Sequence, residues 1–596
     1  MTLSVSSPTT AEQESADTLR RVLTALDERS HFKMEAGAGA GKTYSLIDTL
    51  RHILTNRGDY LPRDGQRVAC ITYTNVARNE IIRRTDGSPY VFAETIHGFL
   101  WENISRFRKT LIQEIKNLPG WERRLAELGS LEGYNVSYDL GFRNINDVTL
   151  SLHHEDIPEL AGRLFKKPKF RKLVADRFPV ILVDEYQDTP AGLAEAMLGM
   201  DPGTPTPRAP VYGFFGDHWQ QIYEKTCGVI DHESVQLIQK RANWRSSKSV
   251  VALLNAMRPE LPQAAVTEAE EGSVTVYHTN DWSGPRGTHS KKGQLPEHVL
   301  KETRKWVQER TRRHRGESAC EMPPKILMLT HSSIASELGF GGIDRAFKYN
   351  DDYVRKSDDV VSFLLDVIEP CCEYFNNKQY GPMFDLLKRS RPRMRTRNDK
   401  NGWADLFGKL ETARSSENVG TVIDILLTQQ YFAVPQAVVG RERKWKLAIE
   451  ALGEGEELSE PRRLMEYGKF REVSYREVIA LRDYVEENTP FSTQHGVKGA
   501  EYPTVIAVFG GGWSQYNFPE MLAKFSRRAS FVAAEKKRYE RSRNLFYVAC
   551  SRAQEHLVML FTTELSDDSL QTLRDWVGET NIVSIRYSPD GAPTSS

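Results

Sequence analysis

The sequence has few cysteines, no net charge and no long apolar run. Six cysteines in 596 residues, with no CxxC pair among them, are too few and too scattered for a disulfide scaffold or a compact zinc site. Lys plus Arg and Asp plus Glu both number 80. This balance excludes a globally basic coat, so any phosphate binding must come from a local groove.

No stretch reaches the roughly 18 apolar residues that a membrane helix needs. The amino-terminal segment also lacks the charged and then apolar pattern of a signal peptide. We therefore expect a cytoplasmic protein that does not contact a membrane.

The composition is that of a globular protein, with 39% hydrophobic and 27% charged residues. The length suggests about four folding units. Short apolar runs separated by helical stretches predict an α/β fold with parallel sheets, and their grouping before and after residue 240 predicts two sheets. These runs lie at residues 68–71, 180–183, 211–215, 326–329, 505–508 and 557–561.

Residues 36–43 read AGAGAGKT and form the strongest local signal. Small residues let the backbone curl so that its N–H groups point at phosphate oxygens, and the helix that follows adds its positive end. In such a P-loop, Lys42 bridges the β and γ phosphates and Thr43 binds Mg²⁺. The alternative is a Gly/Ala-rich turn before a helix, but the Lys-Thr pair at the helix start favours the P-loop.

Two carboxylates, Asp184 and Glu185, follow the apolar run at residues 180–183. Asp184 is predicted to hold Mg²⁺, and Glu185 to activate the attacking water. Acidic residues at a strand end alone are often helix caps. Together with the P-loop, they indicate Mg²⁺-dependent nucleoside triphosphate hydrolysis.

The segment DEYQDT at residues 184–189 resembles the second helicase motif of the UvrD/Rep/PcrA group, the superfamily 1A DNA helicases. Other segments resemble the family's remaining motifs and occur along the chain in the family's order. The resemblance implies two RecA-like lobes with an ATP site between them, and two mainly helical inserted subdomains. The other motif-like segments lie at residues 68–85, 95–99, 216–223, 243–246, 493–501 and 544–553.

Two stretches with a mostly helical pattern, read with the lobes that the resemblance implies, predict how the chain is divided. Lobe 1A is expected in two parts, residues 1–100 and 176–240, around a helical insertion 1B at residues 101–175. Lobe 2A is likewise expected in two parts around a longer helical insertion 2B. We place lobe 2A at residues 241–335 and 486–596, the latter with the C-terminal tail, and insertion 2B at residues 336–485.

The resemblance also implies roles around the nucleotide. Gln220 is expected to sense the γ-phosphate, and Arg245 and Arg552 to act as arginine fingers from the second lobe. With Glu185 they form the predicted catalytic set. Trp244 is expected to stack on adenine, although core packing is an alternative for an indole. The predicted nucleotide-binding residues are Gln13 at the adenine edge, Glu501 at the ribose, Trp244, and Ala36, Gly37, Ala38, Gly39, Ala40, Gly41, Lys42, Thr43 and Tyr44.

The resemblance further implies that single-stranded DNA crosses both lobes. Such a strand needs aromatic faces for its bases and donors for its phosphates. Each candidate taken alone could be a packing residue, but its position within a matched motif favours DNA contact. The candidates are Tyr73, Thr74, Asn75, His97, Tyr223 and His495.

Three departures from the family pattern stand out. The family's base-stacking tryptophan after Tyr223 is missing, because residues 224–228 contain no aromatic residue; base stepping would then use Tyr223 or Trp219. Tyr44 stands where an arginine often sandwiches adenine. The insertion before Asp184 is shorter than in the housekeeping enzymes, which leaves a smaller surface for duplex DNA.

The first functional hypothesis is an ATP-dependent helicase or translocase that moves 3′ to 5′ on single-stranded DNA and unwinds tailed duplex DNA. A repair helicase acting alone would use the same chemistry. The departures motivate an alternative: a nucleotide-responsive regulatory subunit that serves a separate nuclease partner, for example in an anti-phage system such as Gabija, with weak or no unwinding alone.

Overall fold

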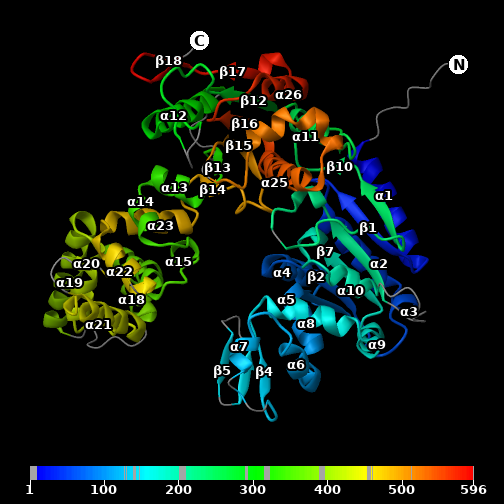
Figure 1. Ribbon diagram of the computed structural model, residues 1–596, viewed down its shortest axis with the longest axis horizontal. Helices are drawn as coiled ribbons and strands as arrows, with labels where there is room; N and C mark the ends of the chain where they lie inside the picture. The colour runs from blue at the N-terminus through cyan, green and yellow to red at the C-terminus, as the bar shows by residue number, and fades with distance from the viewer. Residues whose placement is uncertain are drawn as a thin grey trace.

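The computed structural model describes residues 10–594 apart from 127, 129–130, 139–142, 147, 200–209, 224, 289–292, 315–322, 388–395, 453–457, 460 and 512. Two six-stranded sheets organise this part of the chain, and all of their strand pairs are parallel (Figure 1). The predicted α/β class with two RecA-like lobes is confirmed. No helix among the described residues combines the length and apolarity that a membrane span requires.

The first sheet has the strand order β3-β2-β7-β8-β1-β9. Its central strands are buried along their whole length, as parallel strands covered by helices on both faces must be. We call this sheet and its helices the first lobe. Its strands are β1 (His31–Ala36), β2 (Val68–Thr72), β3 (Val91–Thr95), β7 (Val180–Asp184), β8 (Val211–Gly216) and β9 (Val235–Lys240), and its helices are α1 (Ala11–Asp27), α2 (Lys42–Thr55), α3 (Arg57–Tyr60), α4 (Asn75–Arg84) and α10 (Leu193–Leu198).

The second sheet has the order β14-β13-β15-β16-β12-β17, and with its helices it forms the second lobe. Helix α11 packs on β12 and β16, and α25 packs on β15 and β16. The strands are β12 (Ser273–His278), β13 (Lys325–Met328), β14 (Phe491–Thr493), β15 (Tyr502–Phe509), β16 (Ala553–Phe561) and β17 (Ile582–Ser584), and the helices are α11 (Lys248–Met257), α12 (Glu297–His314), α24 (Phe518–Ala523), α25 (Ala533–Cys550) and α26 (Asp567–Val577).

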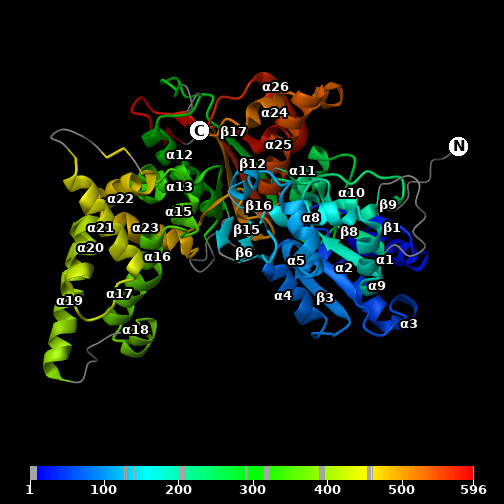
Figure 2. The same ribbon diagram turned by 60° about the horizontal axis from the view of Figure 1, so that its bottom comes forward.

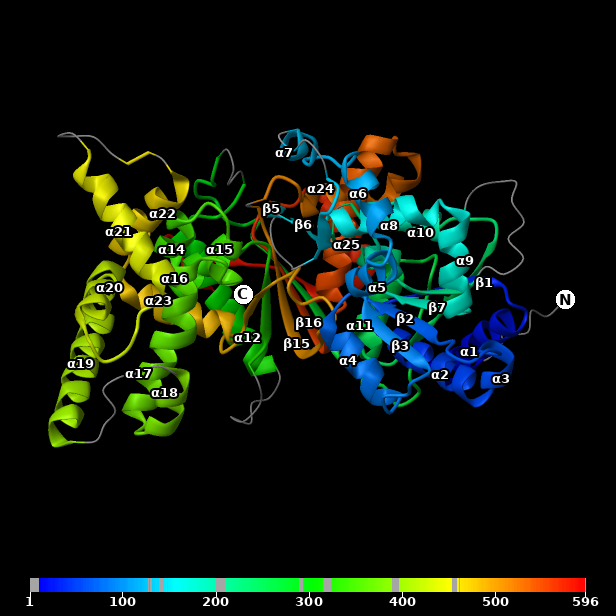
Figure 3. The same ribbon diagram turned by 90° about the horizontal axis from the view of Figure 1, so that it is seen from below.

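Between β13 and β14 the chain forms a group of helices. Its apolar core is continuous with one face of the second sheet, and Figures 2 and 3 show it projecting on the side away from the first sheet. Residues 364–368 form a π-helical turn between α16 and α17. The helices are α13 (His331–Leu338), α14 (Gly341–Ala346), α15 (Asp351–Val354), α16 (Asp359–Phe363), α17 (Glu369–Asn376), α18 (Tyr380–Leu386), α19 (Arg397–Ser416), α20 (Val419–Thr428), α21 (Gln436–Glu450), α22 (Arg462–Glu472) and α23 (Tyr475–Val485).

The shorter insertion, expected to be helical, also contains a three-stranded sheet in the order β4-β6-β5. Its strands are β4 (Asn135–Ser137), β5 (Asn144–Asn146) and β6 (Thr149–Ser151). Three-residue strands are too short to show the alternation by which a strand is recognised, so the sequence did not reveal them. The helices of this segment are α5 (Ile96–Ile104), α6 (Arg108–Ile115), α7 (Glu122–Leu125), α8 (Asp156–Phe165) and α9 (Pro168–Arg177).

Candidate functional site

The phosphate-binding loop joins β1 to α2 at the carboxyl edge of the first sheet. Gly39 and Gly41 both have φ of 73°, a conformation that costs glycine little and other residues more. Gly41 is the N-cap of α2, and Lys42 is its first residue. The loop therefore presents Lys42 and the amino end of a helix to the same space, as anion binding requires.

The second lobe and the segment that leads into it lie directly against this loop. The backbone N–H of Trp244 donates to the carbonyl of Gly39 at 2.8 Å. The side chain of Asn243 donates to the carbonyl of Ala38 at 3.1 Å, and the Ala38 N–H donates to the hydroxyl of Tyr547 at 3.2 Å. The P-loop is thus clamped between the two lobes.

Asp184 ends β7, and Glu185 follows it with a left-handed φ of 49°. Burial and the neighbouring Glu185 charge raise the pKa of Asp184 to about 7. Although burial opposes it, the charges of Lys42 and Lys498 hold the pKa of Glu185 below its usual value. A cation beside Asp184 would relieve this crowding of negative charge, so the site suits Mg²⁺ held by Asp184 and the Thr43 hydroxyl.

A cavity of about 410 Å³ lies between the two lobes over the P-loop. It gathers most of the predicted ATP-site residues from segments far apart in the sequence. It also includes Arg84, Gly499 and Gln554, which were not predicted. The predicted residues along its wall are Gly39, Ala40, Gly41, Lys42, Thr43, Tyr44, Glu185, Gln220, Trp244, Arg245, Glu501 and Arg552.

Some predicted residues do not line this cavity. The side-chain oxygen of Gln13 accepts the backbone N–H of Thr10 at 3.1 Å and so helps to cap α1. Ala36 ends β1, buried, and the side chain of Gln263 lies where a Cβ on Gly37 would project. Ala38 packs into the core of the second lobe.

Both predicted arginine fingers reach the cavity. Arg245 Nε donates to Glu501 Oε2 at 2.5 Å. Arg552 is 1% exposed, and its Nη2 donates to Gln220 Oε1 at 3.3 Å. Burial and the charge of Arg245 lower the pKa of Arg552 to about 9. An anionic ligand would stabilise the buried Arg552 cation.

Lys498 was not singled out from the sequence, although it lies within a matched motif. Its ammonium group pairs with Asp188 and donates to the carbonyl of Gln220 at 2.8 Å. It therefore ties the second lobe to the loop that carries Gln220.

Trp244 and Tyr44 lie at the rim of the cavity, with 48% and 59% of their surface exposed. A Cβ on Gly41 would have both within 4 Å, at 3.6 Å from Trp244 Cδ1 and 3.8 Å from Tyr44 Cβ. Core packing, the alternative for Trp244, does not fit this exposure. The indole Nε1 donates to Ser15 in α1 at 2.9 Å.

The DNA-contact candidates fall into separate groups. Tyr73 and Tyr223 stack at 5.5 Å between ring centroids and are partly exposed. Thr74 is the exposed N-cap of α4, and Asn75 begins that helix. His97 lies apart, at the start of α5, where burial and the neighbouring His154 lower its pKa to about 4.

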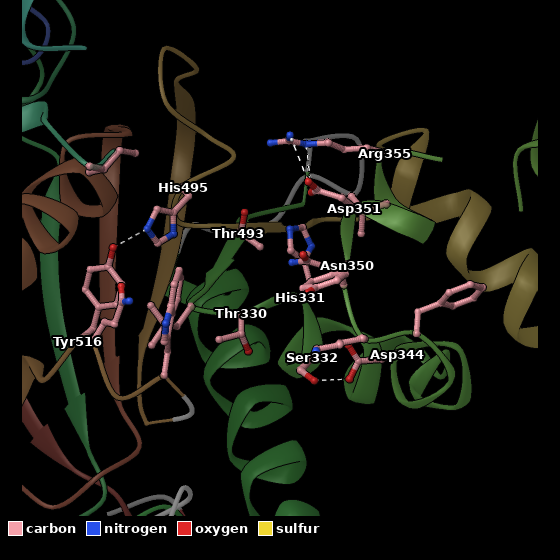
Figure 4. Close-up of a pocket in the computed structure, with 18 of the residues that line it drawn as sticks. Thr330, His331, Ser332, Asp344, Asn350, Asp351, Arg355, Thr493, His495 and Tyr516 are labelled. Carbon is pink, nitrogen blue, oxygen red and sulfur yellow. Dashed lines mark hydrogen bonds and ion pairs between the residues drawn. The ribbon is translucent and has the colours of Figure 1, made fainter. Parts of the chain in front are cut away.

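A second cavity, of about 780 Å³, is lined by both Tyr223 and His495. Figure 4 shows His495 and Tyr516 on one side of it and Asn350 on the other. His495 Nε2 lies 2.8 Å from the hydroxyl of Tyr516. The cavity continues along the first turn of α13 and the loop before α15, where Thr330, His331 and Asn350 line it.

Trp513, which the sequence reasoning missed, also lines this second cavity. It is 38% exposed, and its ring centroid lies 5.4 Å from that of His495. The available signal was an aromatic residue directly after a glycine run at the carboxyl end of an expected strand. Trp219, named as a base-stepping candidate, is wrong in that role because it is 2% exposed and packs against Tyr547.

Comparison with known proteins agrees with this arrangement. A family model described as an AAA domain matches residues 20–226, and one described as a UvrD-like helicase C-terminal domain matches residues 448–564. The chain is 22% identical to the Gabija protein GajB of Bacillus cereus, over 93% of this chain and 96% of that protein. It is 24% identical to the RecBCD enzyme subunit RecB of Buchnera aphidicola, over 31% of this chain and 14% of that subunit.

The two family matches fall on the two lobes whose facing surfaces enclose the P-loop cavity. The motif order, the paired parallel sheets and the matched families lead to one assignment. The chain belongs to the UvrD-like superfamily 1 helicases.

Proposed function

We propose that this protein hydrolyses ATP with Mg²⁺ between its two lobes and uses the cycle to move 3′ to 5′ along single-stranded DNA. The observation that carries the proposal is the 410 Å³ cavity, which joins the P-loop, Glu185 and Gln220 to Arg245 and Arg552. The direction of movement rests on the family resemblance alone.

In the proposed reaction, Glu185 accepts a proton from a water whose oxygen attacks the γ-phosphorus. The bond between that phosphorus and the β,γ-bridging oxygen breaks, and ADP leaves with the electron pair. Lys42, Arg245 and Arg552 stabilise the charge on the transferring group. Mg²⁺, held by Asp184 and Thr43, would supply charge neutralisation at the β and γ oxygens. Trp244 and Tyr44, exposed at the rim of the cavity, would flank the adenine ring.

The second cavity supports the DNA part of the proposal. Tyr223 and Trp513 line this cavity with partly exposed aromatic rings. Stacking of bases on aromatic rings is a mode of single-strand binding that tolerates any sequence. Thr330 and Asn350 offer polar groups near the same cavity.

The test is steady-state ATP hydrolysis by the intact chain and by Lys42→Ala. We expect Lys42→Ala to abolish turnover, because the cavity loses its main phosphate cation. Lys409→Ala, which removes a lysine that pairs with Asp405 on the exposed face of α19, is the control and should retain full turnover. Equal turnover by Lys42→Ala and the control would overturn the proposal.

A second function is favoured by the similarity to the Gabija protein, which extends over nearly the whole of both chains. We propose as this alternative that the chain is a nucleotide-responsive subunit of an anti-phage complex and serves a separate nuclease. Strand displacement on 3′-tailed and 5′-tailed duplexes separates the two. If the isolated chain unwinds the 3′-tailed duplex but not the 5′-tailed one, it is a self-sufficient helicase. ATP hydrolysis without strand displacement on either duplex supports the regulatory subunit.

A further inference from the structure

Three buried charged residues, Arg258, Asp217 and Glu35, form ion pairs that join the two lobes. None of them lines the 410 Å³ cavity over the P-loop, which we call the ATP cavity. Arg258 follows α11 of the second lobe and is 2% exposed. Its Nη1 donates to Asp217 Oδ1 at 2.7 Å, and its Nη2 donates to Glu35 Oε1 at 2.9 Å. Both carboxylates belong to the first lobe: Glu35 lies on β1 just before the P-loop, and Asp217 follows β8. A single guanidinium group therefore bridges the lobes.

Asp217 is connected to two residues of the proposed reaction. Its Oδ2 accepts the side-chain N–H of Gln220 at 2.7 Å. Its backbone N–H donates to Gln187 Oε1 at 2.9 Å, and Gln187 Nε2 donates to Glu185 Oε2 at 2.6 Å. The position of Asp217 therefore sets Gln220 directly and Glu185 through one intermediate side chain.

The packing around this chain of contacts leaves little freedom. A Cβ on Gly216 would lie 2.3 Å from Gln187 Oε1, so glycine is what lets Gln187 approach the strand end. The Arg258 guanidinium also lies over the ring of Trp219, at 5.2 Å from its centroid. Side chains this closely confined transmit a shift of Asp217 instead of absorbing it.

Glu35 anchors the other arm of Arg258. It accepts the hydroxyl of Tyr186, and its Oε1 lies 2.6 Å from His218 Nδ1. Although burial opposes it, contacts with His218 and Arg258 hold the pKa of Glu35 well below its usual range. Removing Arg258 would take a shared positive charge away from two buried carboxylates, Glu35 and Asp217, which is a costly change.

We propose that Arg258 is a positioning residue that couples contact between the lobes to the alignment of Gln220 and Glu185. The proposal rests on the proposed ATP hydrolysis. When the lobes meet, the Arg258 guanidinium fixes the position of Asp217. Gln220 and Glu185, which are held through Asp217, then align for the reaction. When the lobes separate, Arg258 withdraws, Asp217 loses its anchor, and water activation ends. Hydrolysis is thereby confined to the closed arrangement.

The test compares Arg258→Met with Arg414→Met. Arg414 forms a similar but slightly more exposed pair, with Nη2 2.6 Å from Glu369 Oε2, and both residues lie within the helical insertion. We expect Arg258→Met to lower kcat by about tenfold or more with KM for ATP changed by less than about threefold, as for a lost transition-state interaction. Arg414→Met should lose thermal stability and keep kcat. Arg258→Lys should recover part of kcat, since it restores the charge but not both contacts.

Amide hydrogen exchange provides a readout that does not depend on turnover. Arg258→Met should speed exchange in the segment 216–221 by about tenfold or more relative to the unmodified protein, because local opening no longer breaks the ion pairs. Arg414→Met should leave that segment unchanged. Equal exchange and equal kcat in the two variants would overturn the role of Arg258. An unmodified protein without ATPase activity would instead overturn the proposed function, while the exchange data would still decide whether Arg258 holds this segment.

Discussion

At the scale of single residues, Trp513 offers the clearest new aromatic surface for a nucleic acid. It lies beside His495 and is 38% exposed in a channel that Tyr223 also borders. Replacing Trp513 with alanine should weaken single-stranded DNA binding by about 1–3 kcal/mol through lost stacking. Fluorescence anisotropy with a labelled oligonucleotide measures this. Trp282→Ala, which removes an indole packed on Tyr587 elsewhere in the second lobe, serves as the control. Equal DNA affinity in both variants would show that Trp513 does not contact the DNA.

A pH effect is expected from His495. Burial and the nearby His331 lower its pKa from 6.5 to about 4. Between these two values the unfolded chain binds more protons than the folded one, so stability is present above about pH 6.5 and is lost as pH falls toward 4. His495→Gln keeps a hydrogen-bond acceptor for Tyr516 without this titration.

Thermal unfolding midpoints at pH 7 and pH 5 test the effect. The unmodified protein should lose more stability between the two conditions than His495→Gln does. Equal losses would mean that the imidazole is not held neutral.

Some site residues could be predicted from the sequence and others could not, for a physical reason. Lys42, Glu185 and Arg552 could be named because short local motifs carry their chemistry, and all three line one cavity. Trp513 and Arg258 belong to no such motif. Arg258 meets Glu35 across 223 positions of the chain, and only folding brings such residues together.

At the scale of elements, the strand-to-helix turn of the P-loop depends on Gly39. A Cβ there would lie 2.7 Å from Asn243 Oδ1 and 2.8 Å from Arg245 Cβ, on a backbone that is already left-handed. Gly39→Ala should therefore displace the loop and lower affinity for a non-hydrolysable ATP analogue by about tenfold or more. Losing one hydrogen bond to a charged phosphate costs about 1.5–3 kcal/mol, and about 1.4 kcal/mol is tenfold in affinity.

Gly65→Ala is the matched control. Gly65 has a similar φ of 80° but nothing within 4 Å of an added Cβ. The Gly65→Ala substitution should lower the free energy of unfolding by about 1 kcal/mol through backbone strain and leave nucleotide affinity intact. Calorimetric titration with the ATP analogue measures the affinity of both variants. Equal affinities would show that contact with Asn243 and Arg245 does not shape the loop.

Element types were predictable where the apolar pattern is long. The buried runs that became β2, β7 and β8 contain enough Val, Ile and Phe to mark strands covered on both faces. The three short strands of the first insertion gave no such signal. Each has three residues, and Leu150 of β6 is the fully buried one among them.

At the scale of the whole molecule, the function depends on how the two lobes meet. The grouping of the apolar runs before and after residue 240 predicts two sheets, and the motif order implies two lobes. Neither predicts that Tyr547, Lys498 and Arg258 all reach from the second lobe into the first. These contacts make the ATP cavity a property of the lobe interface and not of the P-loop alone.

The most direct test of this account is ATP turnover by the intact chain as a function of single-stranded DNA concentration, at low and at moderate salt. If the lobe interface links nucleotide chemistry to a bound strand, turnover should rise by about tenfold or more to a plateau, and the DNA needed for half of the rise should increase with salt. A rate that is the same with and without DNA at both salt concentrations would contradict the account.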